Sequence, residues 1–478
     1  MLWSFGDQFS LRFVQMLVSI VLARLLLPAQ FGLIGMLAIF TAIADAIMDS
    51  GFGSALIQKK HLTREDTSSI FFFNLFVGII LAGLLSLAAP LIANFYKQPI
   101  LVPITRILSL NLIINAFALV QTSLLTKRME FKLQFKINLS AAILSGAIAV
   151  FMAYRGFGVW SLVALLVTAN LFRAIFLWAF NNWRPQAVFS FKSLETMFPF
   201  GSKLLFSQLI SRIGDNSFQV VIGRMFTVSD LGYYNRASSF GKIVTDFFGS
   251  SIGKVSFPAL APLQDDVVVL KRAYRKAIKL STFVHFPLMI GVMAAADALI
   301  RLLLTEKWAP SIPYFQLMCV VGLPYPLHVL NLNLLKVKGR SDLFLRLEII
   351  KQLSVIPAIA LTYQWGITGL LYGQIAISFL AYFLNSYYSR QLIGYREIDQ
   401  MKDVFPFLLR SLLMGAAMIQ VGLIQNQNLF VVLLLQFITG VFVYFLINFL
   451  AKSPELFEII EILTKIVSEY ITKHKMPV

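Results

Sequence analysis

Long apolar runs, each about 20 residues in length and separated by short polar segments, recur along the whole chain. A run of this length crosses the hydrocarbon core of a bilayer, about 30 Å thick, as one α-helix. The first run covers residues 3–26 and the last covers residues 428–450. No strand-like alternation accompanies them, so the pattern predicts an all-α membrane protein with about fourteen transmembrane helices.

Composition supports the same class, because 58% of the 478 residues are hydrophobic and only 13% are charged. Soluble proteins contain about 25% charged residues. The net charge of +18 comes mainly from short loops that follow the even-numbered runs, so we attribute it to the positive-inside rule and expect no nucleic-acid partner. With that orientation, both termini face the cytoplasm. The even-numbered loops include Lys59, Lys60, Arg64, Lys127, Arg128, Lys271, Arg272, Lys336, Lys338 and Arg340.

The second half of the chain repeats the first at an offset of 200 residues. Polar and glycine matches are the informative ones, since apolar matches are common in membrane sequences: Gln8, Arg12, Arg24, Gly32 and Gly53 correspond to Gln208, Arg212, Arg224, Gly232 and Gly253. Two six-helix units of the same orientation are therefore predicted, related by an axis along the membrane normal. We expect bundles at 1–200 and 201–400, two further transmembrane helices at 401–452, and a cytoplasmic tail at 453–478.

Polar residues are concentrated in the leading helical hairpin of each unit. Ser4, Gln8, Arg12, Gln15 and Ser19 follow helical spacing in the first run, and Gln208, Arg212, Asp215 and Gln219 do so in the seventh. The second run adds Asp45 and Asp49, and the eighth adds Lys242 and Asp246. A charged residue in mid-bilayer costs about 2.5–3.5 kcal/mol, so these residues need either a wet cavity or a charged partner.

Two interpretations of the buried charges remain open. They form ion pairs that hold helices together, or they line a substrate- or ion-binding cavity between the two units. Arg12 and Asp45 are expected at similar depth, as are Arg212, Asp215, Lys242 and Asp246. The duplication favours the cavity, because two copies of a polar hairpin that meet at a pseudo-twofold axis line one chamber.

Two segments have amphipathic helical spacing and are expected to lie on the membrane surface. One is basic and covers residues 264–280, and the other is the tail at 455–474. The chain contains no Walker motif, no His/Cys cluster and no nucleophile elbow, and the loops predicted to lie outside are short. We therefore expect a transporter without cofactor or metal, and not an enzyme.

Several segments resemble the Wzx-type polysaccharide flippases of the multidrug/oligosaccharidyl-lipid/polysaccharide (MOP) superfamily, and in particular the exporters of colanic acid and lipopolysaccharide. LARLLLPAQFGLIGM, DSGFGSALIQKKHLTREDTSS and FYKQP resemble the first half of these proteins. FGSKLLFSQLISRIGDNSFQVVIGR, DLGYYNRA and VSFPALAPLQDD resemble the second half. The resemblance extends from about residue 2 to residue 390.

This resemblance implies two six-helix bundles in a V and alternating access to a central cavity, as in the MATE transporters. It implies a bacterial inner-membrane protein that moves oligosaccharides linked to undecaprenyl diphosphate from the cytoplasmic to the periplasmic leaflet. The products would be O-antigen, exopolysaccharide or capsule, and the partners would include a polysaccharide polymerase and its chain-length machinery. The alternatives are a drug/cation antiporter and a flippase for lipid-linked peptidoglycan precursors.

The expected roles of the polar residues follow from this substrate. A diphosphate is bound best by cations, and arginine offers a planar fork for its oxygens. We expect Arg12, Arg212 and Lys242 to bind the diphosphate, while gating or ion coupling would involve Asp45, Asp49, Asp215 and Asp246. The glycan would lie against Gln8, Gln15, Asn216 and Gln219.

Overall fold

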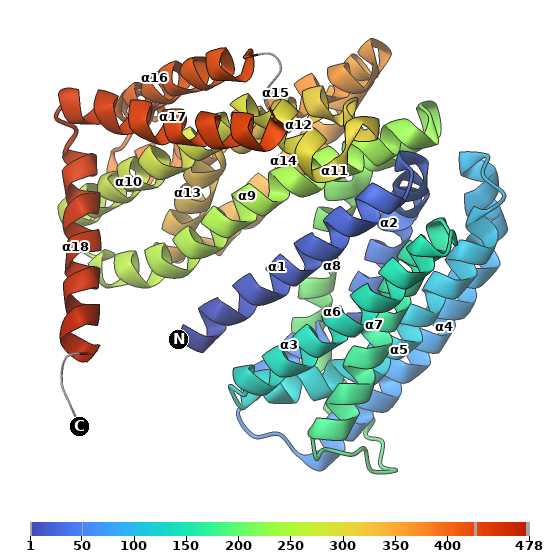
Figure 1. The fold of residues 1–478 in the computed structure, drawn as a ribbon. Coiled ribbons are helices and arrows are strands. Elements are labelled where there is room, and N and C mark those ends of the chain that lie inside the picture. The colour runs from blue at the N-terminus through green and yellow to red at the C-terminus, as the bar shows by residue number, and fades with distance from the viewer. Residues whose placement is uncertain (1, 50, 425–427, 475–478) are drawn as a thin grey trace. The chain divides into compact units, whose positions relative to one another are not determined.

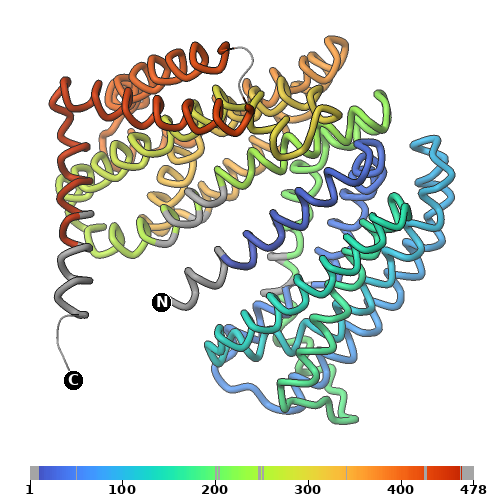
Figure 2. Tube along the Cα trace, in the orientation of Figure 1, coloured from blue at the N-terminus to red at the C-terminus, as the bar shows by residue number. Residues whose placement is uncertain are grey.

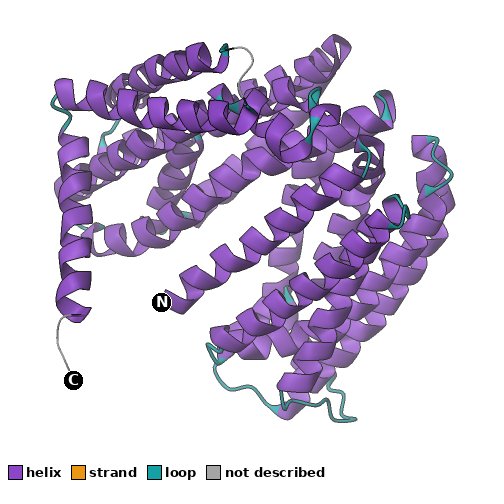
Figure 3. Ribbon diagram, in the orientation of Figure 1, coloured by secondary structure: helices purple, strands orange, loops and turns teal. Residues whose placement is uncertain are grey.

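The computed structural model of the protein describes residues 2–49, 51–424 and 428–474. These residues form helices joined by short turns, and no strand occurs in these three ranges (Figure 3). The all-α prediction is therefore confirmed for the described chain. Its residues fall into two compact units, 1–235 and 236–478. The compact units do not test the bundle boundaries at 200 and 400 that the sequence repeat predicts, because those boundaries describe the duplicated segments; they stay a prediction.

The first unit contains α1 to α8 and the start of α9 (Figure 1). The long helices α4 and α5 pack against each other, as do α6 and α7, and α2 packs against α8 (Figure 2). The bounds are α1 Leu2–Leu25, α2 Pro28–Asp49, α3 Phe52–Gln58, α4 Arg64–Tyr96, α5 Leu101–Lys127, α6 Phe131–Tyr154, α7 Val159–Phe180, α8 Phe191–Met225 and α9 Val228–Leu260.

The second unit contains the rest of α9 and the helices from α10 to α18. Its core is formed largely by α10, α13, α15 and α16. The bounds are α10 Val267–Ala294, α11 Ala296–Leu304, α12 Ser311–Gly322, α13 Tyr325–Val337, α14 Ser341–Thr362, α15 Gly366–Ile393, α16 Glu397–Gly422, α17 Leu429–Leu450 and α18 Pro454–His474, with short 3-10 helices at Ala261–Leu263, Glu306–Trp308 and Tyr363–Trp365.

Ten helical segments of the described chain are long and apolar enough to cross a membrane. The expected number of about fourteen spans is not confirmed. The difference lies in α1, α8 and α9, which are not among the ten segments, and in α14 and α15, which belong to a single segment at Asp342–Ile393. These three helices carry polar residues of the sequence repeat, such as Arg12 on α1, Arg212 on α8 and Lys242 on α9.

The turn between α1 and α2 has the same construction as the turn between α8 and α9. Two residues separate the helices in each case, at positions 200 residues apart. The Gln30 side chain accepts a hydrogen bond from the amide of Leu27 at 2.9 Å, and the Asp230 side chain accepts one from the amide of Thr227 at 3.2 Å. Each side chain thus caps the start of its helix, and the repeat seen in the sequence extends to the conformation of its turns.

The starts of α2 and α9 cross at two glycines within the first unit. An added Cβ at Gly32 would lie 1.9 Å from the carbonyl oxygen of Val228, and one at Gly232 would lie 2.0 Å from the carbonyl oxygen of Pro28. The two contacts are reciprocal, as expected for two copies of one hairpin related by a pseudo-twofold axis. Only glycine permits this backbone approach.

The basic segment at 264–280 differs from its prediction, because most of it forms the first half of α10 and continues into a span candidate. Its apolar residues Leu270, Tyr274 and Ile278 are almost fully buried in the core of the second unit. They occur at intervals of four residues, so this face packs against protein and does not lie on a membrane surface. The expected tail helix is present as α18.

Ion pairs connect α18 and α16 to the basic face of α10. Lys276 pairs with Glu458, and Lys279 Nζ lies 3.6 Å from Glu455 Oε1. Arg275 Nη2 donates to Asp403 Oδ1 at 2.6 Å, and the Tyr395 hydroxyl donates to Asp403 Oδ2. Burial and the hydrogen bond to Asp403 raise the pKa of Tyr395 above its usual range.

Asp403→Ala is expected to destabilise the second unit by about 2–3 kcal/mol, because hydrogen bonds to a charged group contribute about this much. The variant leaves Tyr395 as a buried donor and removes the partner of Arg275, which is itself half exposed. Thermal denaturation of the purified protein in detergent would measure the loss. The control is Asp265→Ala, at an exposed position; equal melting temperatures of the two variants would contradict the prediction.

Candidate functional site

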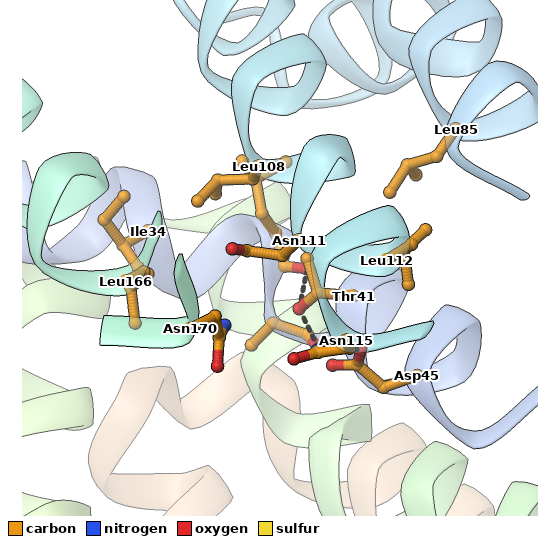
Figure 4. A pocket seen from close by; sticks show the side chains of 12 residues that line it. Ile34, Thr41, Asp45, Leu85, Leu108, Asn111, Leu112, Asn115, Leu166 and Asn170 are labelled. Carbon is orange, nitrogen blue, oxygen red and sulfur yellow. Dashed lines mark hydrogen bonds between the residues drawn. The ribbon is translucent and has the colours of Figure 1, made fainter. Parts of the chain in front are cut away.

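The first unit contains a cavity of about 240 Å³ between α2, α4, α5 and α7. Most of its walls are apolar, as expected inside a membrane helix bundle. Figure 4 shows the side chains that line it, among them the polar residues Thr41, Asp45, Asn111, Asn115 and Asn170. One carboxylate, three carboxamides and one hydroxyl therefore line a space whose other walls are apolar.

Helical spacing brings these polar groups together. Thr41 and Asp45 lie one turn apart on α2, and Asn111 and Asn115 lie one turn apart on α5. Asn115 Nδ2 donates to Asp45 Oδ1 at 3.5 Å, a long hydrogen bond. The Thr41 hydroxyl donates back to the carbonyls of its own helix. Among the described residues, Asn111 Oδ1 is buried without a hydrogen-bond partner, so it can accept a hydrogen bond from a bound group.

The size and chemistry of the cavity limit what it can hold. A water molecule occupies about 30 Å³ of liquid volume, so the space admits several waters and not an oligosaccharide. Carboxylate and amide oxygens are acceptors that suit a proton, a hydrated cation or a single hydroxylated group. The cavity is therefore suited to ion coupling, or to contact with the edge of a larger substrate.

A cation from α8 acts on this cluster. Arg212 interacts electrostatically with the Asp45 carboxylate, and the Gln208 side chain hydrogen-bonds to Asp49 one turn further along α2. Both contacts lie within the first unit. The predicted acidic residues of α2 are thus associated with the predicted polar stripe of α8, as expected if the hairpins form one polar surface.

The remaining predicted residues fall into three groups. The side chains of Arg12 and Gln15 on α1, Asp215 on α8 and Lys242 on α9 are exposed. Asn216 Nδ2 donates to the carbonyl of Arg212 at 2.7 Å, and Gln219 Oε1 is buried without a partner in the described chain. The side chains of Gln8 and Asp246 lie outside the described part of the protein. A joint diphosphate site of Arg12, Arg212 and Lys242 stays a prediction.

Sequence reasoning missed the three asparagines of the cavity, because amides in an apolar run carry no charge. Asn111 and Asn115 do have a recognisable signal, since two amides four residues apart share one face of a helix. Asn170 stands alone in α7, and only the packing of α7 against α5 and α2 places it at the cavity.

The second unit contains an apolar groove of about 770 Å³ along α10, α16 and α17. Its walls are almost entirely hydrocarbon and include Pro287, Met418, Phe437 and Phe445, with Tyr444 as a polar member. The Tyr444 hydroxyl donates to the carbonyl of Phe283 at 2.7 Å, which leaves its ring to line the groove. Such a surface suits an alkyl or isoprenoid chain.

Comparison with known proteins identifies the family. The sequence profile described as "Polysaccharide biosynthesis protein" matches residues 21–313, more than half of the chain. The teichuronic acid biosynthesis protein TuaB of Bacillus subtilis is 32% identical over 63% of this chain and 63% of TuaB. The lipopolysaccharide biosynthesis protein WzxC of Escherichia coli is 28% identical over 76% of this chain and 75% of WzxC. The alignment thus spans less than two thirds of TuaB.

Solved structures show the fold. The lipid II flippase MurJ in an inward closed conformation aligns with a TM-score of 0.71, covers 93% of this chain and 97% of its own, and is 17% identical. An inward-facing multidrug MATE transporter of the MOP superfamily aligns with a TM-score of 0.63 over 80% of this chain and 94% of its own, also at 17% identity. The chain therefore belongs to the polysaccharide biosynthesis protein family and has the fold of MOP superfamily transporters.

Proposed function

We propose that this protein is a flippase that moves undecaprenyl-diphosphate-linked oligosaccharides from the cytoplasmic to the periplasmic leaflet by alternating access. The observation that carries the proposal is the family match, since relatives in that family are described as proteins of teichuronic acid and lipopolysaccharide biosynthesis. A third relative, ExoT of Rhizobium meliloti, is described as a succinoglycan biosynthesis transport protein and is 30% identical over 65% of this chain.

The distribution of polar groups supports a substrate with a charged head and an apolar tail. In this proposal Arg12, Arg212 and Lys242 bind the diphosphate, since arginine and lysine are the side chains that bind phosphate oxygens. The isoprenoid tail remains in the bilayer and can lie in the apolar groove of the second unit. The cavity at Asp45 is too small for the glycan, and we assign it to gating or ion coupling.

The direct test is genetic. In a strain without the gene, the lipid-linked oligosaccharide is expected to accumulate in the inner leaflet and the surface polysaccharide is expected to be lost. A plasmid copy of the gene should restore both. Normal surface polysaccharide in the deletion strain, measured in a background without a second family member, would contradict the proposal.

The acidic cavity favours one alternative, a drug/cation antiporter, because a carboxylate in an apolar pocket attracts an organic cation. Efflux of a cationic dye from cells that overproduce the protein distinguishes the two functions. We expect no efflux above that of cells with an empty vector, whereas an antiporter would lower the dye content several-fold.

A further inference from the structure

A second pocket in the first unit lies at the ends of its helices and is lined by four cationic side chains. Its volume is about 780 Å³, and its walls include Arg64 at the start of α4, Lys127 at the end of α5, Arg128 after it, and Arg184 after α7. The proposed transport function assigns no role to this pocket.

Neutral acceptors hold two of these cations in place. Lys127 Nζ donates to the carbonyls of Leu56 and Ile57 at 3.1 and 3.3 Å, in the last turn of α3. Arg184 donates to the carbonyls of Trp178 and Asn181 at 2.7 and 2.6 Å, at the end of α7. Because carbonyls carry no net charge, these bonds fix the side chains and leave their positive charges in the pocket.

Few carboxylates balance this charge. Asp66 is buried nearby, but its carboxylate already has two partners. Lys59 Nζ lies 2.8 Å from Asp66 Oδ2, and the amide of Thr63 donates to the same carboxylate, which caps α4. Glu130 Oε1 lies 3.9 Å from Arg128 Nη1, and both side chains are more than two-fifths exposed, so their interaction is weak. Among the described ion pairs, none involves Arg64. The pocket is therefore strongly positive.

The basic pocket of the second unit provides a contrast within the same molecule. It is lined by Arg272, Arg275, Lys276 and Lys279 together with Glu455 and Glu458. Three of its four cations, Arg275, Lys276 and Lys279, pair with Asp403, Glu455 and Glu458. Three protein carboxylates thus offset most of the positive charge of this pocket, whereas the first unit leaves its pocket open to an external anion.

The position of the pocket at the ends of span candidates indicates which kind of anion it can bind. Span candidates begin at Arg64 and end at Lys127 and Phe180, so the pocket lies at the ends of helices that can cross a membrane. Trp183 lines the pocket, and Arg184 stacks on Trp178 at 5.3 Å. Tryptophan is enriched at membrane–water interfaces, and basic pockets between transmembrane helices at this level bind anionic lipid headgroups.

The linker between α7 and α8 gives this pocket a fixed wall. The Trp183 indole donates to the Thr67 hydroxyl at 3.1 Å, and the amide of Gln186 donates to the Ser68 hydroxyl at 3.0 Å. Thr67 and Ser68 are buried at the start of α4. A pocket with anchored walls can bind a headgroup without a large ordering cost.

We propose that this pocket of Arg64, Lys127, Arg128 and Arg184 binds the phosphate group of an anionic membrane lipid. The guanidinium groups supply paired N–H donors for phosphate oxygens, and the fixed Lys127 adds a point charge. A bound lipid would join the ends of α4, α5 and α7. The proposal does not depend on the substrate that the protein transports.

Native mass spectrometry of the full-length protein in detergent, titrated with synthetic phosphatidylglycerol, tests the site. Arg64→Gln combined with Arg128→Gln removes two charges that no internal hydrogen bond requires. We expect this variant to bind phosphatidylglycerol about ten-fold more weakly, while binding of phosphatidylcholine with the same acyl chains stays unchanged. Arg64→Lys with Arg128→Lys keeps the charge and should bind within about three-fold of the natural protein.

The matched control is Arg272→Gln with Lys276→Gln, which removes two charges from the basic pocket of the second unit, where carboxylates offset most of the charge, and should leave binding unchanged. Melting temperatures without lipid show whether each variant is folded. Equal affinity of the Arg64/Arg128 glutamine variant and the natural protein would overturn the proposal. Displacement of the lipid by inorganic phosphate at equal concentration would also overturn it, since the pocket would then recognise a free anion.

Discussion

Asp45→Ala is expected to reduce surface polysaccharide at least ten-fold in a strain that carries no other copy of the gene, while the amount of protein in the membrane stays normal. Asp45 is the carboxylate of the cavity in the first unit, where it meets Asn115 and interacts with Arg212. Its loss leaves Arg212 without this partner and removes the group best suited to carry a proton or cation. Quantification of cell-surface sugar, with membrane protein measured by immunoblot, provides the result.

A double variant separates the two roles that the sequence leaves open for Asp45. If Asp45 and Arg212 only form a structural ion pair, then Asp45→Asn with Arg212→Gln keeps a neutral polar pair and should recover export lost in either single variant. If the charges act in transport, the double variant stays inactive, and this is the result that we expect. Recovery above half of the normal polysaccharide would contradict a transport role. Glu65→Gln, at an exposed position on α4, is the control.

Gly232→Ala is expected to destabilise the protein by about 3 kcal/mol or more, and Gly32→Ala to do the same. A Cβ at either position would lie 2.0 Å or less from a backbone carbonyl oxygen of the opposing helix. Backbone atoms cannot move aside as a flexible side chain can, so α2 and α9 would have to separate. Thermal denaturation followed by size-exclusion chromatography measures the effect on the purified protein.

A third glycine supplies the control for this prediction. An added Cβ at Gly83, inside α4, would meet no atom within 4 Å. Gly83→Ala should therefore be neutral or slightly stabilising, because alanine is the better helix former. Melting temperatures of Gly32→Ala and Gly232→Ala that match that of Gly83→Ala would show that the close crossing of the two hairpins does not limit stability.

The apolar runs and the internal repeat predicted much of the fold, because both can be recognised from the types of residues along the chain without knowledge of how the helices pack. The all-helical class, the paired hairpins and the tail helix at 455–474 are present in the described chain. The number of spans was less predictable, since α1, α8 and α9 are not among the ten span candidates of the described chain. The segment at 264–280 was placed on the membrane surface because its amphipathic pattern shows which face is apolar, but not whether lipid or protein covers that face.

The candidate site was predicted only in part, for a similar reason. The sequence identifies Asp45 and Arg212 as charged residues in apolar runs, and the structure brings them together. Arg12 was expected at the depth of Asp45, but depth along a helix does not determine which neighbour a side chain faces. The asparagines of the cavity carry no charge, and α5 and α7 must pack against α2 before these amides lie beside Asp45.

Thiol accessibility is the most direct test of whether water reaches the polar cavity of the first unit. Cys319 is buried and is the sole cysteine, so Cys319→Ala gives a cysteine-free background. Asn115→Cys then places a thiol in the cavity. Leu87→Cys is the control, because Leu87 is 78% exposed on the span candidate Arg64–Tyr96, where lipid and not water would cover the thiol. A membrane-impermeant charged thiol reagent needs water and a thiolate. We predict rapid modification of Asn115→Cys and none of Leu87→Cys in proteoliposomes; equal inertness of both thiols would contradict a water-filled, ion-coupling cavity.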